Sequence, residues 1–244
     1  MGDFKAGVIN YIRQVSNGLV DLFYPPVCCL CERKADSNDQ LICRRCWDFI
    51  QGFDAAYCSQ CRSFLTQGML CRDCGRESIT VWSLGYFDTH LRDIIHFLKF
   101  ENLKPLANKI GEKLGEKLTE HDYVKRIDLI VPVPLHQSRH YERGFNQAEE
   151  IARAISHITG LPIYTDVLYS TRKTRQQAKL HGHDREANVR GAFAVDDPDR
   201  ILKHKTILLV DDVTTSGATL RENERVLKEA SAQRIIAAVA ATAV

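Results

Sequence analysis

Residues 207–219, with the sequence ILLVDDVTTSGAT, constrain the fold more than any other stretch of the chain. The first four form a short apolar run, suited to a strand that is buried on both faces. Two carboxylates, Asp211 and Asp212, follow where that strand is expected to end, and a loop of small residues comes next. Residues 220–230 then have the spacing of an amphipathic helix. The stretch predicts a strand, a loop and a helix whose N-terminus favours an anion.

The loop after the two carboxylates has the composition of a phosphate site. Its backbone N–H groups and hydroxyls can converge on one phosphate, and Gly217 removes a side chain where a ligand must come close. Carboxylates beside such a loop can accept hydrogen bonds from sugar hydroxyls or hold Mg²⁺, so we expect a sugar phosphate. The alternative is an ordinary strand, turn and helix in which the acids begin the turn and threonines cap the helix. Neither G-x-x-x-x-G-K-[ST] nor G-x-G-x-x-G occurs in the chain.

This segment resembles the phosphoribosyl pyrophosphate (PRPP) signature of type I phosphoribosyltransferases. The resemblance implies that Asp211 and Asp212 are catalytic residues that contact the ribose hydroxyls. It also implies that the 5′-phosphate binds to the loop residues Thr214, Thr215, Ser216, Gly217, Ala218 and Thr219.

The nine cysteines all lie between residues 28 and 74, and eight of them form C-x-x-C pairs. Two such pairs can close a tetrahedral Cys₄ site, so four pairs predict two structural Zn²⁺ sites without an open coordination position. Cys29, which lies between two of these residues, is expected to be a small spare residue. The expected metal ligands are Cys28, Cys31, Cys43, Cys46, Cys58, Cys61, Cys71 and Cys74.

The four C-x-x-C turns can be combined in sequence or interleaved. We expect sequential sites, a double zinc ribbon, because each site can then fold locally as metal binds. A disulfide framework is the alternative to metal, but the rest of the chain has the character of a cytosolic protein, in which thiols stay reduced. A thioredoxin-like redox motif needs one such pair rather than four.

The 244 residues, of which 44% are hydrophobic, can form a full α/β core and a small second module. No apolar run approaches the about 20 residues of a spanning helix, and the N-terminus lacks the apolar core of a signal peptide. We therefore expect a cytoplasmic protein with no integral membrane association. The apolar residues within 1–24 recur at helical spacing and predict an amphipathic helix that docks on this protein or a partner. Binding to a membrane surface is the alternative.

Beyond Cys74 the pattern changes to alternating strands and helices, which favours an α/β fold with a mostly parallel, doubly wound sheet. We expect an N-terminal helix over 1–24, a double zinc ribbon over 25–77 and a phosphoribosyltransferase domain over 78–244. The expected strands are residues 80–87, 127–133, 163–169, 207–210 and 235–244, and the expected helices are residues 90–100, 105–118, 145–158 and 220–230.

The loop after the expected strand at 127–133 is a second candidate site, because ligands of such sheets bind at the carboxyl ends of strands. Residues 131–147 read VPVPLHQSRHYERGFNQ. The prolines stiffen this loop. An arginine guanidinium can donate two parallel hydrogen bonds to pyrophosphate oxygens. The alternative is that these arginines are exposed and merely solvated. PVP followed by RGFNQ resembles the ComF (GntX-like) phosphoribosyltransferases, in which this loop is expected to receive pyrophosphate. The corresponding residues are Pro132, Val133, Pro134, Arg139, Arg143 and Gly144.

A third segment, residues 172–190, carries six Lys or Arg and two Asp or Glu. A mobile basic loop could close over PRPP and exclude water during the reaction, and a solvated surface loop is the alternative. Lys99 also matches a family position, although the glycine that usually follows is replaced by Glu101 or Asn102. The substrate-contacting residues implied by the family resemblance are Lys99, Thr174, Gln177, Arg185 and Asn188.

Together, the order of the cysteine pairs, RGFNQ, R-x-x-N-V and the PRPP loop makes the chain similar to the ComF family over nearly its whole length. The resemblance implies Mg²⁺-dependent transfer of a phosphoribosyl group from PRPP to an unidentified nucleobase or other acceptor. It also implies a role in natural competence or in the use of imported DNA.

Two other classes of function stay open from the sequence. One is a non-catalytic PRPP- or nucleotide-binding scaffold of the DNA-uptake machinery, which contacts competence proteins or single-stranded DNA. The other is thiol-redox activity, which requires cysteines without metal. The acceptor and the oligomeric state, a homodimer among the options, are also left open.

Overall fold

The computed structural model describes residues 27–35, 41–50, 52, 55–65, 71–74, 78–121, 124–173 and 182–243. The chain divides into two compact units, Met1–Ile50 and Gln51–Val244. In the first unit, α2 (Arg44–Asp48) follows the cysteine at position 43. The N-terminal helix that we expected over residues 1–24 lies outside the described residues. The expected boundary between residues 77 and 78 stays a prediction.

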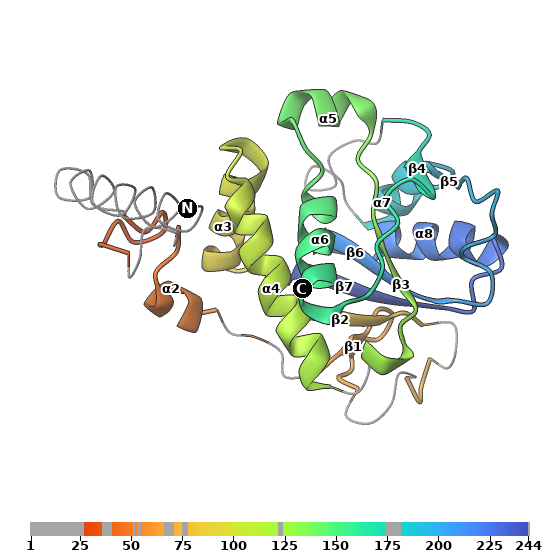
Figure 1. Cartoon of the computed structure of the whole chain (residues 1–244), viewed down its shortest axis with the longest axis horizontal. Helices are drawn as coiled ribbons and strands as arrows, with labels where there is room; N and C mark the ends of the chain where they lie inside the picture. Colours follow the sequence, from red (N-terminus) through yellow and green to blue (C-terminus); the bar gives the residue numbers. More distant parts are fainter. Residues whose placement is uncertain are drawn as a thin grey trace, which may run out of the picture. The chain divides into compact units, whose positions relative to one another are not determined.

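A five-stranded sheet forms the centre of the second unit (Figure 1). Its order is β1 (Tyr57–Cys58), β2 (Thr80–Tyr86), β7 (Arg234–Thr242), β6 (Thr206–Thr214) and β3 (Leu129–Pro132). The last four strands are parallel to one another, whereas β1 pairs antiparallel with β2. This confirms the mostly parallel α/β sheet, and it puts the carboxyl ends of β2, β7, β6 and β3 along one edge.

Helices cover both faces of the sheet. The helices α3 (Thr89–Phe100), α4 (Lys104–Glu120) and α6 (Gln147–Thr159) pack on one face, and α8 (Ala218–Glu229) packs on the other. Figure 1 shows α4 and α6 side by side, with α8 across the strands from them. Successive residues of β6 from 206 to 210 point to opposite faces and are all buried, which explains why the sequence at 207–210 is apolar without alternation.

Two glycines bring α4 and α6 into close contact. A Cβ atom at Gly111 would lie 2.4 Å from the Ile151 carbonyl oxygen and 2.5 Å from the Ala154 Cβ. A Cβ at Gly115 would lie 2.8 Å from the Ile158 Cβ. Both glycines lie one helical turn apart on the same face of α4, so they are required for this packing.

The segment expected to form a strand at 163–169 differs from the prediction. Ile163 makes only a single parallel bridge with Ile130, and the exposed Thr165 and Asp166 then lead the chain away from the sheet. The strand that follows, β4 (Leu168–Ser170), pairs antiparallel with β5 (Phe193–Val195) in a separate two-stranded sheet.

Three short helices connect the larger elements: η1 (Val124–Arg126), α5 (Gln137–Arg143) and α7 (Gly182–Val189). We had expected loops where α5 and α7 occur. Within the described ranges, no helix combines the length and the apolar character that crossing a bilayer requires.

Candidate active site

The acidic pair lies at the carboxyl edge of the sheet, where the sequence predicted it. The strand β6 is longer than expected, because it continues through Asp211 and Asp212 to Thr214. Asp211 pairs in register with Val239 of β7, so the ladder fixes the backbone of the acidic pair. The acidic side chains are thus held on a rigid strand rather than in a turn.

Lys99 approaches this acidic pair from the last turn of α3. Its Nζ atom lies 2.7 Å from an Asp212 carboxylate oxygen, and both side chains are mostly shielded from solvent. The helix begins at Asp88, whose carboxylate accepts hydrogen bonds from the N–H groups of His90 and Leu91. The apolar face of α3 then packs into the core, which fixes where its last turn lies. The resemblance-based candidate Lys99 therefore lies at the site.

Burial changes the protonation of Asp211. Loss of solvation, followed by repulsion from the Asp212 carboxylate, raises the pKa of Asp211 to about 8. The Asp212 N–H group, which donates to Asp211 at 2.8 Å, and the charge of Lys99 oppose this rise. A carboxyl group with this pKa is mostly protonated at neutral pH.

In the loop between β6 and α8, the first three backbone carbonyl oxygens accept hydrogen bonds from neighbouring groups. The Thr214 oxygen accepts from the Ala243 N–H group at 2.8 Å. The Ser216 oxygen accepts from the Arg221 guanidinium at 2.8 Å, and the Thr215 oxygen accepts from the Arg62 guanidinium. An anion is repelled by carbonyl oxygens and attracted by N–H groups, so this arrangement favours a phosphate at the start of α8. We call residues 214–219 the phosphate loop.

Gly217 is the residue at which this loop enters the helix. It is the N-cap of α8, with a left-handed φ of 74°. A Cβ atom at this position would lie 3.0 Å from an Arg221 guanidinium nitrogen. Both the backbone conformation and the close approach explain the glycine.

Arg62 and Arg221 are residues of the site that the sequence did not reveal. Arg221 also forms an ion pair of 2.6 Å with Glu186 on α7, so it connects the phosphate loop to the neighbouring helix. Its place in the first turn of α8 is a local signal that could have indicated it. For Arg62 there was no local signal, because its contact with the loop spans 153 residues.

The expected pyrophosphate residues follow the next strand of the sheet. Pro132 ends β3, and the Val133 N–H group donates to the Val210 oxygen at 2.8 Å. The Asn146 side chain donates to the Val133 oxygen at 3.1 Å. The segment that contains Pro134 therefore starts from a fixed position at the same edge as the acidic pair.

The two arginines of this segment lie on α5 rather than in a loop. Arg143 donates to Gln147 at 3.0 Å, and its guanidinium lies 5.9 Å from the centre of the Phe100 ring. Burial, followed by the charge of Arg143, lowers the pKa of Arg139, and attraction to Asp212 acts in the opposite direction. Gly144 ends α5 with a left-handed φ of 76°. Arg139 is thus close enough to Asp212 to feel its charge, and the role of both arginines toward pyrophosphate stays a prediction.

The basic segment is only partly described. Thr174 and Gln177 lie outside the described residues, and Arg185 is described only in its backbone, on α7. Asn188, also on α7, is half-buried. The Gly191 N–H group after this helix donates to Glu222 of α8 at 2.7 Å. The contacts of this segment with substrate stay predictions.

The eight C-x-x-C cysteines form two clusters, grouped in sequence rather than interleaved. Within each cluster the four sulfur atoms lie within 4.8 Å of one another. The Cys31 and Cys43 sulfurs are 3.7 Å apart, and the Cys61 and Cys71 sulfurs are 3.5 Å apart. Tetrahedral zinc with Zn–S bonds of about 2.3 Å requires sulfur separations of about 3.8 Å, so both clusters fit Zn²⁺. We call residues 28, 31, 43 and 46 the first cluster and residues 58, 61, 71 and 74 the second cluster.

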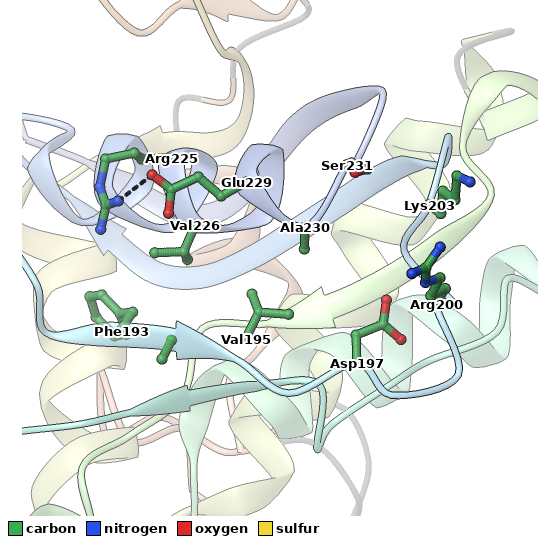
Figure 2. Close-up of a pocket in the computed structure, with 11 residues that line it drawn as sticks. Phe193, Val195, Asp197, Arg200, Lys203, Arg225, Val226, Glu229, Ala230 and Ser231 are labelled. Atoms are coloured by element: carbon green, nitrogen blue, oxygen red, sulfur yellow. Dashed lines mark hydrogen bonds and ion pairs between the residues drawn. The ribbon is translucent and has the colours of Figure 1, made fainter.

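An open hollow of about 640 Å³ lies away from these groups, near the opposite ends of β6 and α8. Figure 2 shows Arg225 paired with Glu229 at one side of it and Arg200 and Lys203 at the other. Its cations are exposed or already paired with carboxylates, and it has no residue in common with the phosphate loop. The hollow is therefore separate from the candidate active site.

Comparison with known proteins gives two family matches. Residues 19–75 match the double zinc ribbon domain, and residues 102–243 match the phosphoribosyl transferase domain. The second match covers the phosphate loop, the acidic pair and α5. The first covers both cysteine clusters.

Relatives resemble the chain over most of its length. Competence protein F of Haemophilus influenzae is 27% identical, over 80% of this chain and 87% of that protein. The DNA utilization protein YhgH of Escherichia coli is 29% identical, over 84% of this chain and 92% of that protein. Among solved structures, a purine phosphoribosyltransferase from Pyrococcus horikoshii matches with a TM-score of 0.36 and 22% identity, over 56% of this chain and 72% of that one.

Proposed function

Because the chain belongs to the phosphoribosyl transferase domain family, we propose that it binds PRPP with Mg²⁺ and transfers the phosphoribosyl group to an acceptor. The observation that carries this proposal is the shared sheet edge, at which the acidic pair lies in the last part of β6 and the phosphate loop continues from the same strand. A sugar phosphate needs both features, because its hydroxyls bind carboxylates and its phosphate binds N–H groups.

In this reaction the bond between ribose C1 and pyrophosphate breaks, and the acceptor atom takes its place at C1. Asp211 and Asp212 hold the ribose hydroxyls and stabilise the positive charge that develops on the ring. The phosphate loop holds the 5′-phosphate and so orients C1 toward the acceptor. Arg139 and Arg143 neutralise the departing pyrophosphate.

Lys99 has a separate role in this proposal. Its ion pair with Asp212 places a positive charge beside the acidic pair. The carboxylate oxygens of the acidic pair are hard ligands that suit Mg²⁺. In such sites Mg²⁺ usually keeps several waters and is bound by one or two carboxylates together with the phosphates of the substrate. When bound, Mg²⁺ supplies positive charge for the leaving pyrophosphate.

For the biological role, we propose a link to natural competence or the use of imported DNA. The support is the similarity to proteins named competence protein F and DNA utilization protein. Those names concern proteins that share between a quarter and a third of their residues with this chain. We propose the cytoplasm as the place where this function is carried out.

The test is calorimetric titration of the zinc-loaded protein with PRPP and Mg²⁺. We expect binding to the wild type and its loss in the Asp211→Asn, Asp212→Asn double variant. The control is Asp199→Asn, which changes an exposed acid in the turn before β6 and should bind as the wild type does. The absence of binding to the folded wild type would refute the proposed function.

Turnover is tested separately, by pyrophosphate release from PRPP in the presence of single nucleobases. Release that depends on one base and is lost in the double variant identifies the acceptor. Binding without release from any acceptor would instead support a non-catalytic PRPP-binding scaffold, which is the second candidate function.

A further inference from the structure

The second cluster is built directly onto the sheet that carries the phosphate loop. Its first two ligands flank a tight turn in which the Cys58 N–H group donates to the Ser63 oxygen at 3.0 Å. The Arg62 N–H group donates to the Cys58 oxygen, also at 3.0 Å. Arg62 has a left-handed φ of 65°, a backbone conformation that is uncommon for a residue with a side chain. We call residues 58–63 the second-cluster turn.

The turn is attached to the sheet by several hydrogen bonds. Ser59 and Ile79 exchange two of these hydrogen bonds. The Ser59 N–H group donates to the Ile79 oxygen at 2.9 Å, and the Ile79 N–H group donates to the Ser59 hydroxyl oxygen at 3.0 Å. The hydroxyl groups of Tyr57 and Thr242 lie 2.5 Å apart and are buried. The position of the turn relative to the carboxyl edge is therefore fixed within one compact unit.

From this turn, Arg62 reaches the phosphate loop. Its guanidinium donates to the Thr215 oxygen and, at 3.3 Å, to the Ala243 oxygen. It also lies 5.9 Å from the centre of the Tyr57 ring. Ala243 in turn donates its N–H group to Thr214. One side chain therefore connects the second-cluster turn to the phosphate loop and to the residue that follows β7.

We propose that Arg62 is a positioning residue for the 5′-phosphate site, and that metal in the second cluster holds it in place. This inference rests on the proposed PRPP-binding function. Arg62 keeps the Thr215 carbonyl turned away from the phosphate and adds a positive charge beside the loop. Zinc bound by Cys58 and Cys61 would clamp the turn in addition to its hydrogen bonds, and so would hold the Arg62 backbone and guanidinium in place. The second cluster then controls phosphate affinity without touching substrate.

The test compares two arginines of the same cluster. Arg62→Ala removes the contact, whereas Arg72→Ala removes an equal charge from the exposed Arg72, between the other two ligands. For each zinc-loaded variant, zinc content, the affinity for PRPP with Mg²⁺, and hydrogen exchange of the amides of residues 214–219 without ligand are measured. Arg62→Lys is the conservative variant, because it keeps the positive charge but lacks the guanidinium that donates to both the Thr215 and the Ala243 oxygens.

We expect Arg62→Ala to keep its zinc, to bind PRPP at least about tenfold more weakly and to exchange the loop amides faster. Arg62→Lys should recover part of the affinity, and Arg72→Ala should match the wild type in every measurement. The inference would be overturned if Arg62→Ala left both the hydrogen exchange of the loop amides and the PRPP affinity unchanged. It would also be overturned if Arg62→Ala and Arg72→Ala lost PRPP affinity equally.

Failure of the proposed function gives a different result. If the wild type does not bind PRPP, hydrogen exchange alone decides the structural claim. Faster exchange only in Arg62→Ala would support the positioning of the loop, and equal exchange in all proteins would overturn it.

Discussion

The two cysteine clusters have the same ligands and nearly the same spacing, yet they lie in different structural settings. The first belongs to the Met1–Ile50 unit, where the Cys28 N–H donates to the Arg33 oxygen and the Cys29 N–H to the Leu41 oxygen. The second belongs to the unit of the central sheet, and its first ligand, Cys58, lies in a strand of that sheet. A repeated motif thus does not mean a repeated role, since only the second cluster shares a compact unit with the phosphate loop.

The largest effect should come from breaking one cluster at a time. We expect Cys61→Ser to lower zinc content to about one ion per chain and to weaken PRPP binding on the order of a hundredfold, because the whole second-cluster turn is released. Cys31→Ser should lose one zinc as well, but keep its PRPP affinity within about twofold. Metal analysis measures the zinc content of each variant, and calorimetry measures its affinity for PRPP. Equal losses of affinity in the two variants would show that the clusters act as one module.

A substitution in the phosphate loop tests whether PRPP binding depends on the backbone geometry of the loop, independently of the second cluster. We expect Gly217→Ala to weaken PRPP binding about tenfold, because it strains a left-handed residue and crowds Arg221. Gly160→Ala is the control, because Gly160 has a similar φ of 73° with open space around it. It should cost about 1 kcal/mol of unfolding free energy and leave affinity unchanged. Calorimetry and thermal unfolding separate the two effects.

Proton release distinguishes the acidic pair from the metal clusters. The pKa of Asp211 is raised from 3.8 to about 8 in the folded protein, so this group disfavours the folded state increasingly as pH rises from about 4 to 8. If binding requires the carboxylate, PRPP with Mg²⁺ should release close to one proton at pH 7, and affinity should rise with pH until about 8. Titrations in buffers of different ionisation enthalpy measure this release. It should persist in Cys31→Ser and vanish in Asp211→Asn, and a persistent release in the latter would assign the proton to another group.

The smallest effect should come from the ion pair at the edge of the site. We expect Lys99→Met to weaken PRPP binding by a few fold, because Asp212 loses its partner 2.7 Å away in a mostly shielded position. Lys109→Met is the matched control, since it breaks an exposed pair with Glu112 on α4 and should change affinity by less than about twofold. Equal effects of the two substitutions in calorimetry would remove Lys99 from the site.

The sequence predicted the parts of this fold that depend on local patterns. The strand at β6, the helix α8 and the placement of Asp211 and Asp212 at the sheet edge follow from an apolar run, a loop and a helical period. The double zinc ribbon also followed from the spacing of its cysteines.

What the sequence did not predict depends on long-range contacts. The helix α5 lies where prolines and glycine suggested a loop. Of the segment expected as a strand at 163–169, only residues 168 and 169 belong to a strand, β4, which pairs with β5. Arg62 could not be predicted, because its role follows from how the second-cluster turn is placed beside a loop 153 residues later.

The strand β1 has one more consequence. Its pairing with β2 occupies a hydrogen-bonding edge of the sheet, and this strand ends at the metal ligand Cys58. An unpaired strand edge is a template for intermolecular pairing and aggregation. We therefore expect zinc-free chains, in which the turn after β1 is released, to expose the hydrogen-bonding groups of Thr80 and Val81 on β2 and to aggregate more readily than zinc-loaded chains.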